Sequence, residues 1–298
     1  MYYTTSTYET VAHGETDINV WRKVVPEEAV LHDFLMDGLL ALSAFHFASQ
    51  NPNLQWQYTE IGIQYQSSGL QKYRYALERV TGDNSAALFA FSMIINVLAL
   101  ALPNVYPGST ASSHAEGLMS MLDLVRGVGL MYHDNEMRSI ASRRADFSGL
   151  FQSVYRDTQD FTLREDVVHA LQKLRERADS IAEFVGSEQK RAYTAGISSL
   201  EEAFKRTCAA RHIGSAIAWP ATMHDEELLK LYKDNDPMAQ FIFLHYGVLL
   251  LYAQDRWWGK VTGIKLVEHL SSALHNIDPA WMNWTQWARD IANSDFGR

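Results

Sequence analysis

His32–Ala48, with the sequence HDFLMDGLLALSAFHFA, is the stretch from which the fold can be worked out. Its apolar side chains recur at helical spacing and fill nearly every side, so it predicts a buried α-helix. Asp37 lies about one turn inside this helix and heads a stripe of alanines. Such small side chains allow a second helix, or a ligand, to approach the backbone closely.

Asp37 is the residue in this helix that most needs an explanation, because a buried carboxylate requires a partner. A structural interpretation gives it an ion pair with an arginine, Arg126 or Arg256, or a bond to the helix backbone. A functional interpretation places the carboxyl group at the rim of an apolar cavity. There it would bond a ligand hydroxyl or act as a general acid or base.

Composition limits the classes of protein to which the chain can belong. It has 298 residues, 47% of them hydrophobic, and a net charge of -9 without a basic tract. Direct binding of nucleic acid is therefore not expected. The single cysteine, Cys208, excludes an internal disulfide and a cysteine-rich zinc module. We find no secretory signal, and the apolar stretches 88–102 and 241–253 are short for membrane spans.

The pattern along the chain predicts an all-α fold of roughly ten helices with little or no sheet. Residues 1–24 are expected to form an arm, and residues 25–298 one large domain whose apolar central helices surround a pocket. Asn51–Pro52 and Asp236–Pro237 are stop and start signals. Helices are expected over residues 25–50, 54–80, 86–102, 112–128, 164–186, 189–218, 226–233, 238–255 and 264–277, with a last one after residue 279.

Sequence motifs for cofactor chemistry are missing from the chain. It contains no GxGxxG or GxxxxGK[ST] loop, no HExxH and no GxSxG. The acidic groups at 134–136 and 157–160 lack the paired arrangement of magnesium clusters, so we expect neither a metal nor a cofactor. His46 and His245 are the two histidines deep in apolar helices, and each is either a core residue bonded to a carbonyl or an acid, or a residue with a ligand-contact or proton-transfer role.

Several segments are similar, in the same order, to one protein family. The segment Leu35–His46 closely resembles the signature of the fungal-specific transcription-factor regulatory domain, in its sterol-responsive zinc-cluster branch. Further similarity lies at Leu124–Val128, at Trp219–Pro220, at His245–Leu250, at Trp257–Trp258 and at the last three tryptophans. The resemblance implies an all-helical, dimerising domain with an apolar sterol pocket near its C-terminal end. It also implies a location in the cytoplasm or nucleus of a fungus.

Two departures from the family pattern affect the functional expectation. The six-cysteine zinc module that binds DNA is missing, so the chain is expected to be a stand-alone protein or an excised regulatory domain. The family usually has His-Pro-Phe-Leu-Met-His-Gly, whereas this chain has Asp33 for the proline and Asp37 for the second histidine. The second exchange puts an acid inside the helix.

Two functions remain open at this stage, with a purely structural partner protein as a third. The first is binding of an apolar molecule of the sterol, terpenoid or polyketide kind by a homodimer. The second is a cofactor-independent cyclase, isomerase or dehydratase of secondary metabolism that uses the same pocket. Its candidate catalytic residues are Asp37 with His46 or His245. The candidate ligand contacts are Leu40, Ser43, Asp123, Tyr246, Leu249, Leu250, Trp257 and Trp258.

Overall fold

A computed structural model of the chain describes residues 2–12, 15–106, 147, 161–210, 213–222 and 226–294. These residues are helical with short connections, and no strand occurs among them, which confirms the all-α prediction. They divide into two compact units: the first lies within Met1–Arg156 and includes Asp255–Gly259, and the second lies within Asp157–Gln254 and Lys260–Arg298. The predicted domain boundary at residue 25 stays a prediction.

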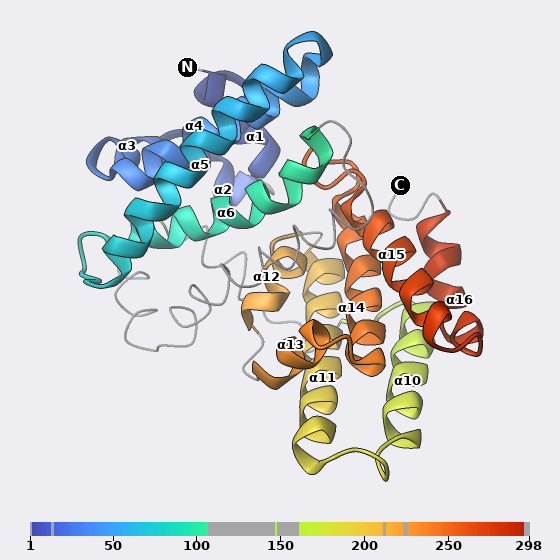
Figure 1. Cartoon of the computed structure of the whole chain (residues 1–298). Helices are drawn as coiled ribbons and strands as arrows, with labels where there is room; N and C mark the ends of the chain where they lie inside the picture. The colour runs from blue at the N-terminus through green and yellow to red at the C-terminus, as the bar shows by residue number, and fades with distance from the viewer. Residues whose placement is uncertain are drawn as a thin grey trace. The chain divides into compact units, whose positions relative to one another are not determined.

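The first unit is built on α4 (Asp33–Gln50), which packs against α5 (Gln55–Leu77) and α6 (Ser85–Val105) (Figure 1). The sequence predicted one helix over residues 25–50, and this is wrong. His32 has an extended backbone, with φ -134° and ψ 99°, and it separates α3 (Val25–Leu31) from α4. The predicted stop at Asn51–Pro52 is confirmed, because Asn51 is the C-cap of α4.

Small residues allow α4, α5 and α6 to pack closely. A Cβ atom on Gly62 of α5 would lie 2.3 Å from the ring of Phe45. A Cβ atom on Gly69 would lie 3.2 Å from Cβ of Asp37 and 3.0 Å from the ring of Phe91. The element that comes close to α4 at Asp37 is therefore a second helix, α5.

The N-terminal residues are helical, although their sequence showed no clear period. They form η1 (Tyr3–Thr7), α1 (Tyr8–Val11), α2 (Glu15–Asn19) and η2 (Val20–Val24). Tyr3 is fully buried, and its hydroxyl donates to the carbonyl of Trp21 at 2.9 Å. Helices of one or two turns are too short to show a periodic pattern, and burial rather than helix propensity stabilises them.

The most apolar helix of the first unit, α6, is longer than predicted. It extends from Ser85 to Val105 with Pro103 inside its last turn, and is long and apolar enough to cross a membrane by length and composition alone. The expectation that this apolar stretch is too short to span a membrane is therefore wrong. However, 83% of its apolar window is buried within the fold, as in a central core helix.

The second unit surrounds α14 (Pro237–Leu250), whose residues from Met238 onward are all buried. The predicted start of α14 is confirmed: Asp236 accepts the backbone N–H of Ala239 at 2.8 Å, and Pro237 occupies the first turn. The helix ends at Leu250 rather than near residue 255. The other elements of this unit, seen in Figure 1, are α10 (Glu165–Ser180), α11 (Ser187–Ala210), α12 (Gly214–Thr222), α13 (Glu226–Lys233), η5 (Leu251–Ala253), α15 (Thr262–Ile277) and α16 (Trp281–Ala292).

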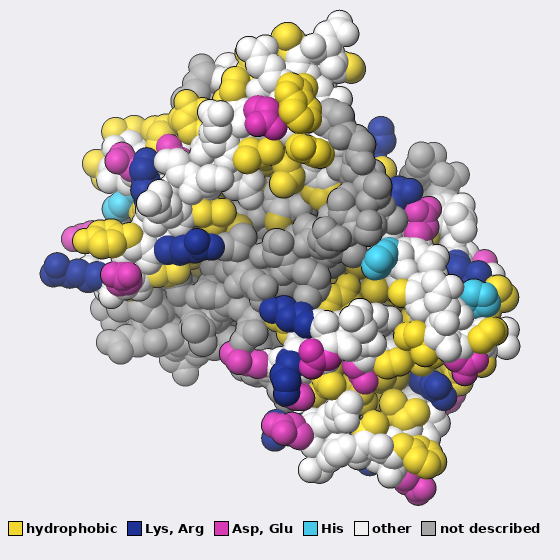
Figure 2. Space-filling model, viewed as in Figure 1, with side chains coloured by type: hydrophobic (Ala, Val, Ile, Leu, Met, Phe, Trp, Pro, Cys, Tyr) yellow, Lys and Arg dark blue, Asp and Glu magenta, His cyan; other side chains and the backbone are white. Residues whose placement is uncertain are grey.

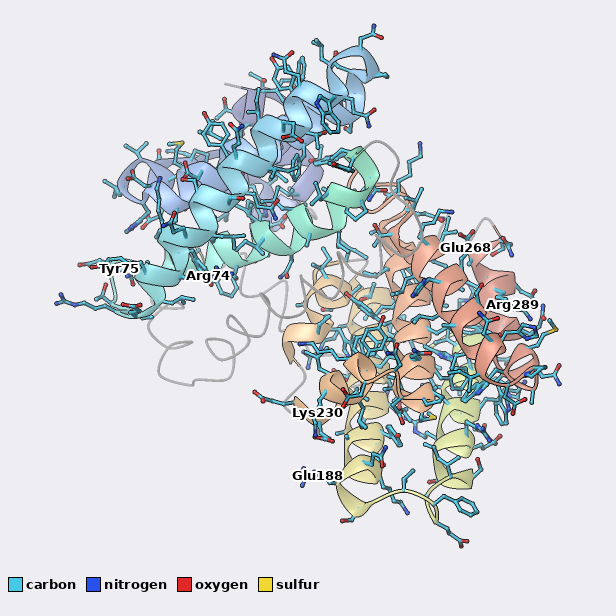
Figure 3. All side chains as sticks on the ribbon, viewed as in Figure 1. Arg74, Tyr75, Glu188, Lys230, Glu268 and Arg289 are labelled. Carbon is cyan, nitrogen blue, oxygen red and sulfur yellow. The ribbon has the colours of Figure 1, made fainter. Side chains whose placement is uncertain are left out.

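Large apolar side chains are exposed on both units. On η3 (Pro52–Leu54) and α5, several large apolar side chains are exposed, among them Trp56, Tyr65 and Tyr75, and apolar atoms are visible over α5 (Figure 2). In the second unit, charged residues such as Glu188, Lys230 and Glu268 point away from the helices (Figure 3).

Candidate functional site

The carboxylate of Asp37 links α4 to α5. One of its oxygens, Oδ2, accepts hydrogen bonds from Ser68 Oγ and from Lys72 Nζ, both at 2.7 Å. The hydrogen bond to Asp37 raises the pKa of Lys72. The predicted partner Arg256 is wrong, because that guanidinium donates to backbone carbonyls near the N-terminus. The other predicted partner, Arg126, lies outside the described residues.

We expect the Asp37–Lys72 pair to contribute about 1 kcal/mol to stability, because the Lys72 side chain is 44% exposed and screened by water. A double-mutant cycle with Asp37→Asn and Lys72→Met, followed by urea unfolding, measures this coupling. The exposed pair Lys265–Glu268 is the matched control and should couple by less than about 0.5 kcal/mol. A coupling of zero would mean that the ion pair does not contribute to stability and that Ser68 is the partner that matters for this carboxylate.

The other candidates on α4 face their own helix or are partly exposed. Ser43 Oγ donates to the carbonyl of Leu39 at 2.7 Å, one turn back, so its hydroxyl proton is used within the helix. Leu40 is half-buried. Asp123, the candidate proposed on a neighbouring helix, lies outside the described residues.

His46 is buried in a chain of hydrogen bonds that determines its tautomer. Tyr2 Oη donates to Gln50 Oε1 at 2.7 Å, so the Gln50 amide nitrogen faces His46 Nε2 at 2.8 Å. Nε2 must then accept, and Nδ1–H donates to Thr7 Oγ1 at 3.0 Å. Burial lowers the pKa of His46 to about 4, so the ring is neutral at neutral pH.

Asp37 and His46 are not brought together as an acid/base pair. They lie on the same helix at positions separated by about 13 Å along its axis. Asp37 is engaged by α5, and both ring nitrogens of His46 have partners. The described contacts give this pair no shared point at which a substrate atom could lie.

Trp257 and Trp258 belong to the first unit and contact its N-terminal helices. The ring of Trp257 stacks on His46, with centroids 5.1 Å apart, and its Nε1 donates to Thr10 Oγ1 at 3.0 Å. Trp258 is fully buried, and its Nε1 donates to the carbonyl of Thr10 at 3.0 Å. Both indole N–H groups are therefore used in contacts within the protein.

His245, in the second unit, is a bonded core histidine. Its Nδ1–H donates to the carbonyl of Phe241 at 2.9 Å, and its ring stacks on Trp287 with centroids 5.5 Å apart. Burial lowers the pKa of His245 to about 4, although the backbone hydrogen bond opposes this shift. As a neutral imidazole enclosed by aromatic rings, His245 contributes to the packing of the core.

Among the predicted site residues, Tyr246 has a buried polar group that forms no hydrogen bond with the described residues. Its side chain is fully buried beside Trp219 and Phe243, and its hydroxyl has no hydrogen-bond partner among the described residues. Burial raises the pKa of Tyr246, so the group is a neutral donor and acceptor. Leu249 and Leu250 follow it on α14 and are also buried. An unpaired buried hydroxyl costs about 1–3 kcal/mol, which a ligand group could recover.

Other buried polar atoms of this unit were not predicted from the sequence, and three of them lie on α11, α14 and α15. Gln240 Oε1 on α14, Ser271 Oγ on α15 and Thr207 Oγ1 on α11 are buried without a hydrogen-bond partner among the described residues. The signal for the first was a lone glutamine in the apolar run of α14. These atoms and Tyr246 therefore lie on α14 or on one of the two helices, α11 and α15, that pack against it.

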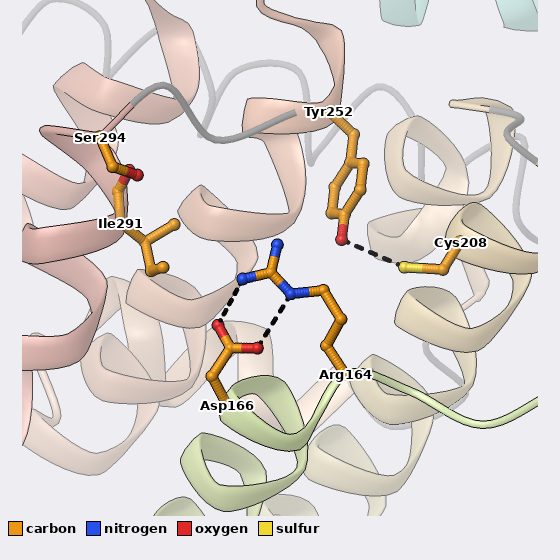
Figure 4. A network of polar contacts seen from close by, with 6 residues as sticks. All are labelled: Arg164, Asp166, Cys208, Tyr252, Ile291 and Ser294. Carbon is orange, nitrogen blue, oxygen red and sulfur yellow. Dashed lines mark hydrogen bonds and ion pairs between the residues drawn. The ribbon is translucent and has the colours of Figure 1, made fainter. Parts of the chain in front are cut away.

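Cys208 is held as a structural thiol. Its Sγ donates to Tyr252 Oη at 3.2 Å, near the Arg164–Asp166 ion pair (Figure 4). Burial raises the pKa of Cys208 and outweighs the opposite effects of Tyr252 and Arg164. A thiol with a raised pKa is a poor nucleophile.

Within the described part of the chain, no three His, Cys, Asp or Glu side chains lie together in a way that could hold an ion. The acidic groups at 134–136 and 157–160 lie outside it.

Comparison with known proteins gives two findings. The family described as fungal specific transcription factor domain matches residues 1–164. A protein of Candida albicans named "Sterol uptake control protein 2" is 29% identical over 120 residues. The alignment covers 38% of this chain and 16% of that relative, so the chain corresponds to a small part of the relative's length.

Proposed function

Because the chain belongs to the fungal specific transcription factor domain family, we propose that it is a regulatory module that senses an apolar small molecule carrying a hydroxyl group. The ligand is received in the second unit, where the hydroxyl of Tyr246 bonds to it. The unpartnered, fully buried hydroxyl of Tyr246 is the observation that carries this proposal.

The chemistry around Tyr246 favours a rigid hydrocarbon with one polar end. Its neighbours are aromatic and aliphatic, with Trp219 at 4.8 Å between ring centroids and Leu249 and Leu250 on the same helix. Binding sites for apolar ligands combine such walls with a few polar groups that fix orientation. The name of the Candida albicans relative refers to sterol uptake, and we therefore propose a sterol or a terpenoid of similar size.

The other parts of the proposal follow from the family and from charge. With a net charge of -9, the chain acts on transcription through protein partners or through a second copy of itself rather than through direct contact with DNA. Its place is the nucleus or cytoplasm of a fungal cell. No observation on the described residues favours the catalytic alternative, because Asp37, His46 and His245 are all engaged within the protein.

Replacing Tyr246 with Phe tests the ligand contact. We expect cholesterol to bind about tenfold more weakly to Tyr246→Phe, because one hydrogen bond is lost. Cholestane, which has no hydroxyl group, should bind equally to both proteins. Without ligand, the variant should be at least as stable as the wild type, because an unpaired buried hydroxyl has been removed. Titration by calorimetry and thermal unfolding measure these quantities.

Two outcomes contradict different parts of this proposal. Equal cholesterol affinity for the variant and the wild type would show that Tyr246 does not bond the ligand. Failure of the wild type to bind either compound would overturn the sterol proposal as a whole.

A further inference from the structure

The segment Asp255–Gly259, which we call the strap, belongs to the first unit although the elements on both sides of it belong to the second. It follows α14 and η5 and precedes α15. A loop that leaves one unit, packs in another and returns is costly to order unless its contacts are specific. The contacts of the strap are therefore informative about its role.

Three consecutive side chains of the strap donate to the end of α1. Arg256 Nη1 donates to the carbonyls of Thr10 and Ala12 at 3.2 and 3.3 Å. Trp257 Nε1 donates to Thr10 Oγ1, and Trp258 Nε1 to the carbonyl of Thr10, both at 3.0 Å. The guanidinium lies where the carbonyls of α1 end, a position that favours a cation.

Two more contacts fix the strap within the first unit. The ring of Trp257 covers His46, which in turn bonds Thr7 of the N-terminal segment. Asn104 Nδ2 of α6 donates to the carbonyl of Trp258 at 2.9 Å. The strap therefore lies among α1, α4 and α6, with donors on its side and acceptors on the N-terminal segment.

The N-terminal segment, residues 2–12, is held in part by these contacts and in part by bonds of Tyr2, Tyr3 and Thr7 within the first unit. Its helices η1 and α1 have five and four residues, far below the length at which an isolated helix is stable in water. Their position is set by packing and by the hydrogen bonds of the strap. Loss of the strap should release the segment, while the longer helices of the unit keep their own packing.

Along the chain, the strap connects α14 and η5 to α15, and α14 carries the proposed ligand site. Its flanking helices α14 and α15 touch through backbone, since a Cβ atom on Gly263 would lie 2.7 Å from the carbonyl oxygen of Gly247. The loop between two helices in such close contact must follow any shift of one against the other. Tyr246 precedes Gly247 on α14, so a ligand bonded to its hydroxyl would act on the helix that makes this contact.

We propose that the strap couples the α14–α15 pair to the N-terminal segment, so that a ligand at Tyr246 controls whether residues 2–12 are held or released. The part that the ligand has in this coupling rests on the function proposed above. A ligand that binds the form with a seated strap stabilises that form and keeps the segment docked. Release of the segment removes Tyr2 and Thr7 from His46.

Hydrogen exchange measured by mass spectrometry on the full chain tests this proposal in three arms. Trp257→Phe removes one donor of the strap, and we expect amides of residues 2–12 to exchange about five to ten times faster. Trp56→Phe, at a tryptophan that is 55% exposed in the same unit, is the control and should leave these amides unchanged.

The second arm uses Gly247→Ala, within the second unit, where the added Cβ would lie 2.9 Å from Val267 Cγ2 of α15. We expect faster exchange both in α14 and in residues 2–12. Faster exchange in α14 alone would overturn the coupling. The third arm adds cholesterol, which should slow exchange in both regions. Slower exchange in α14 alone would overturn the regulation and leave the proposed ligand site intact, whereas no change in either region would overturn the site.

Discussion

Gly263→Ala should lower the free energy of unfolding by about 3 kcal/mol, at the upper end of the cost of overpacking. The added methyl group would lie 2.7 Å from the carbonyl oxygen of Gly247 and 3.0 Å from the backbone nitrogen of Leu251. Both are backbone atoms and cannot turn aside as a side chain could. The two helices must move apart, and thermal unfolding should show a fall in Tm of roughly 6–12 °C.

Gly82→Ala is the matched control, because nothing lies within 4 Å of its Cβ position. It should leave Tm unchanged or raise it slightly, since alanine reduces the conformational entropy of the unfolded chain. If Gly263→Ala were as stable as Gly82→Ala, the backbone contact between α14 and α15 would be refuted.

Trp258→Ala should lower the free energy of unfolding by about 4 kcal/mol. Its side chain is fully buried in the first unit, and its indole N–H bonds the carbonyl of Thr10. Truncation leaves a large cavity and removes one of the bonds that dock α1. Chemical denaturation followed by circular dichroism measures the loss.

For this prediction, Trp56→Ala is the comparison, because the side chain of Trp56 is 55% exposed. It should cost less than about 1 kcal/mol, since little apolar area leaves the interior. Equal losses for the two variants would show that the strap is not part of the core of the first unit.

The sequence was sufficient to predict the elements whose signals are local. Asp236 and Pro237 mark the start of α14 by side-chain chemistry that acts within one turn, and Asn51–Pro52 marks the end of α4 in the same way. The small residues around Asp37 indicated a close approach to α4. Periodicity cannot detect a one-residue break such as His32, because the apolar pattern continues across it.

Contacts between distant residues could not be predicted from the same patterns. The partner of Asp37 is Lys72 on the next helix rather than an arginine, and nothing in the local sequence of either residue distinguishes these possibilities. The short N-terminal helices have no periodic signal at all. One of them, α1, bonds Trp257 and Trp258, which lie more than two hundred residues further along the chain.

By itself, the sequence determined the helical class and the boundaries at Asn51 and Asp236, because propensity, capping and apolar periodicity act over a few neighbouring residues. The family followed from the resemblance of its motifs. Only the tertiary structure decided which polar groups are satisfied. Asp37, His46 and His245 found partners within the protein, whereas the hydroxyl of Tyr246 found none among the described residues. The physical reason is that a hydrogen bond depends on the positions of two atoms about 3 Å apart, and packing brings those atoms together from any part of the chain.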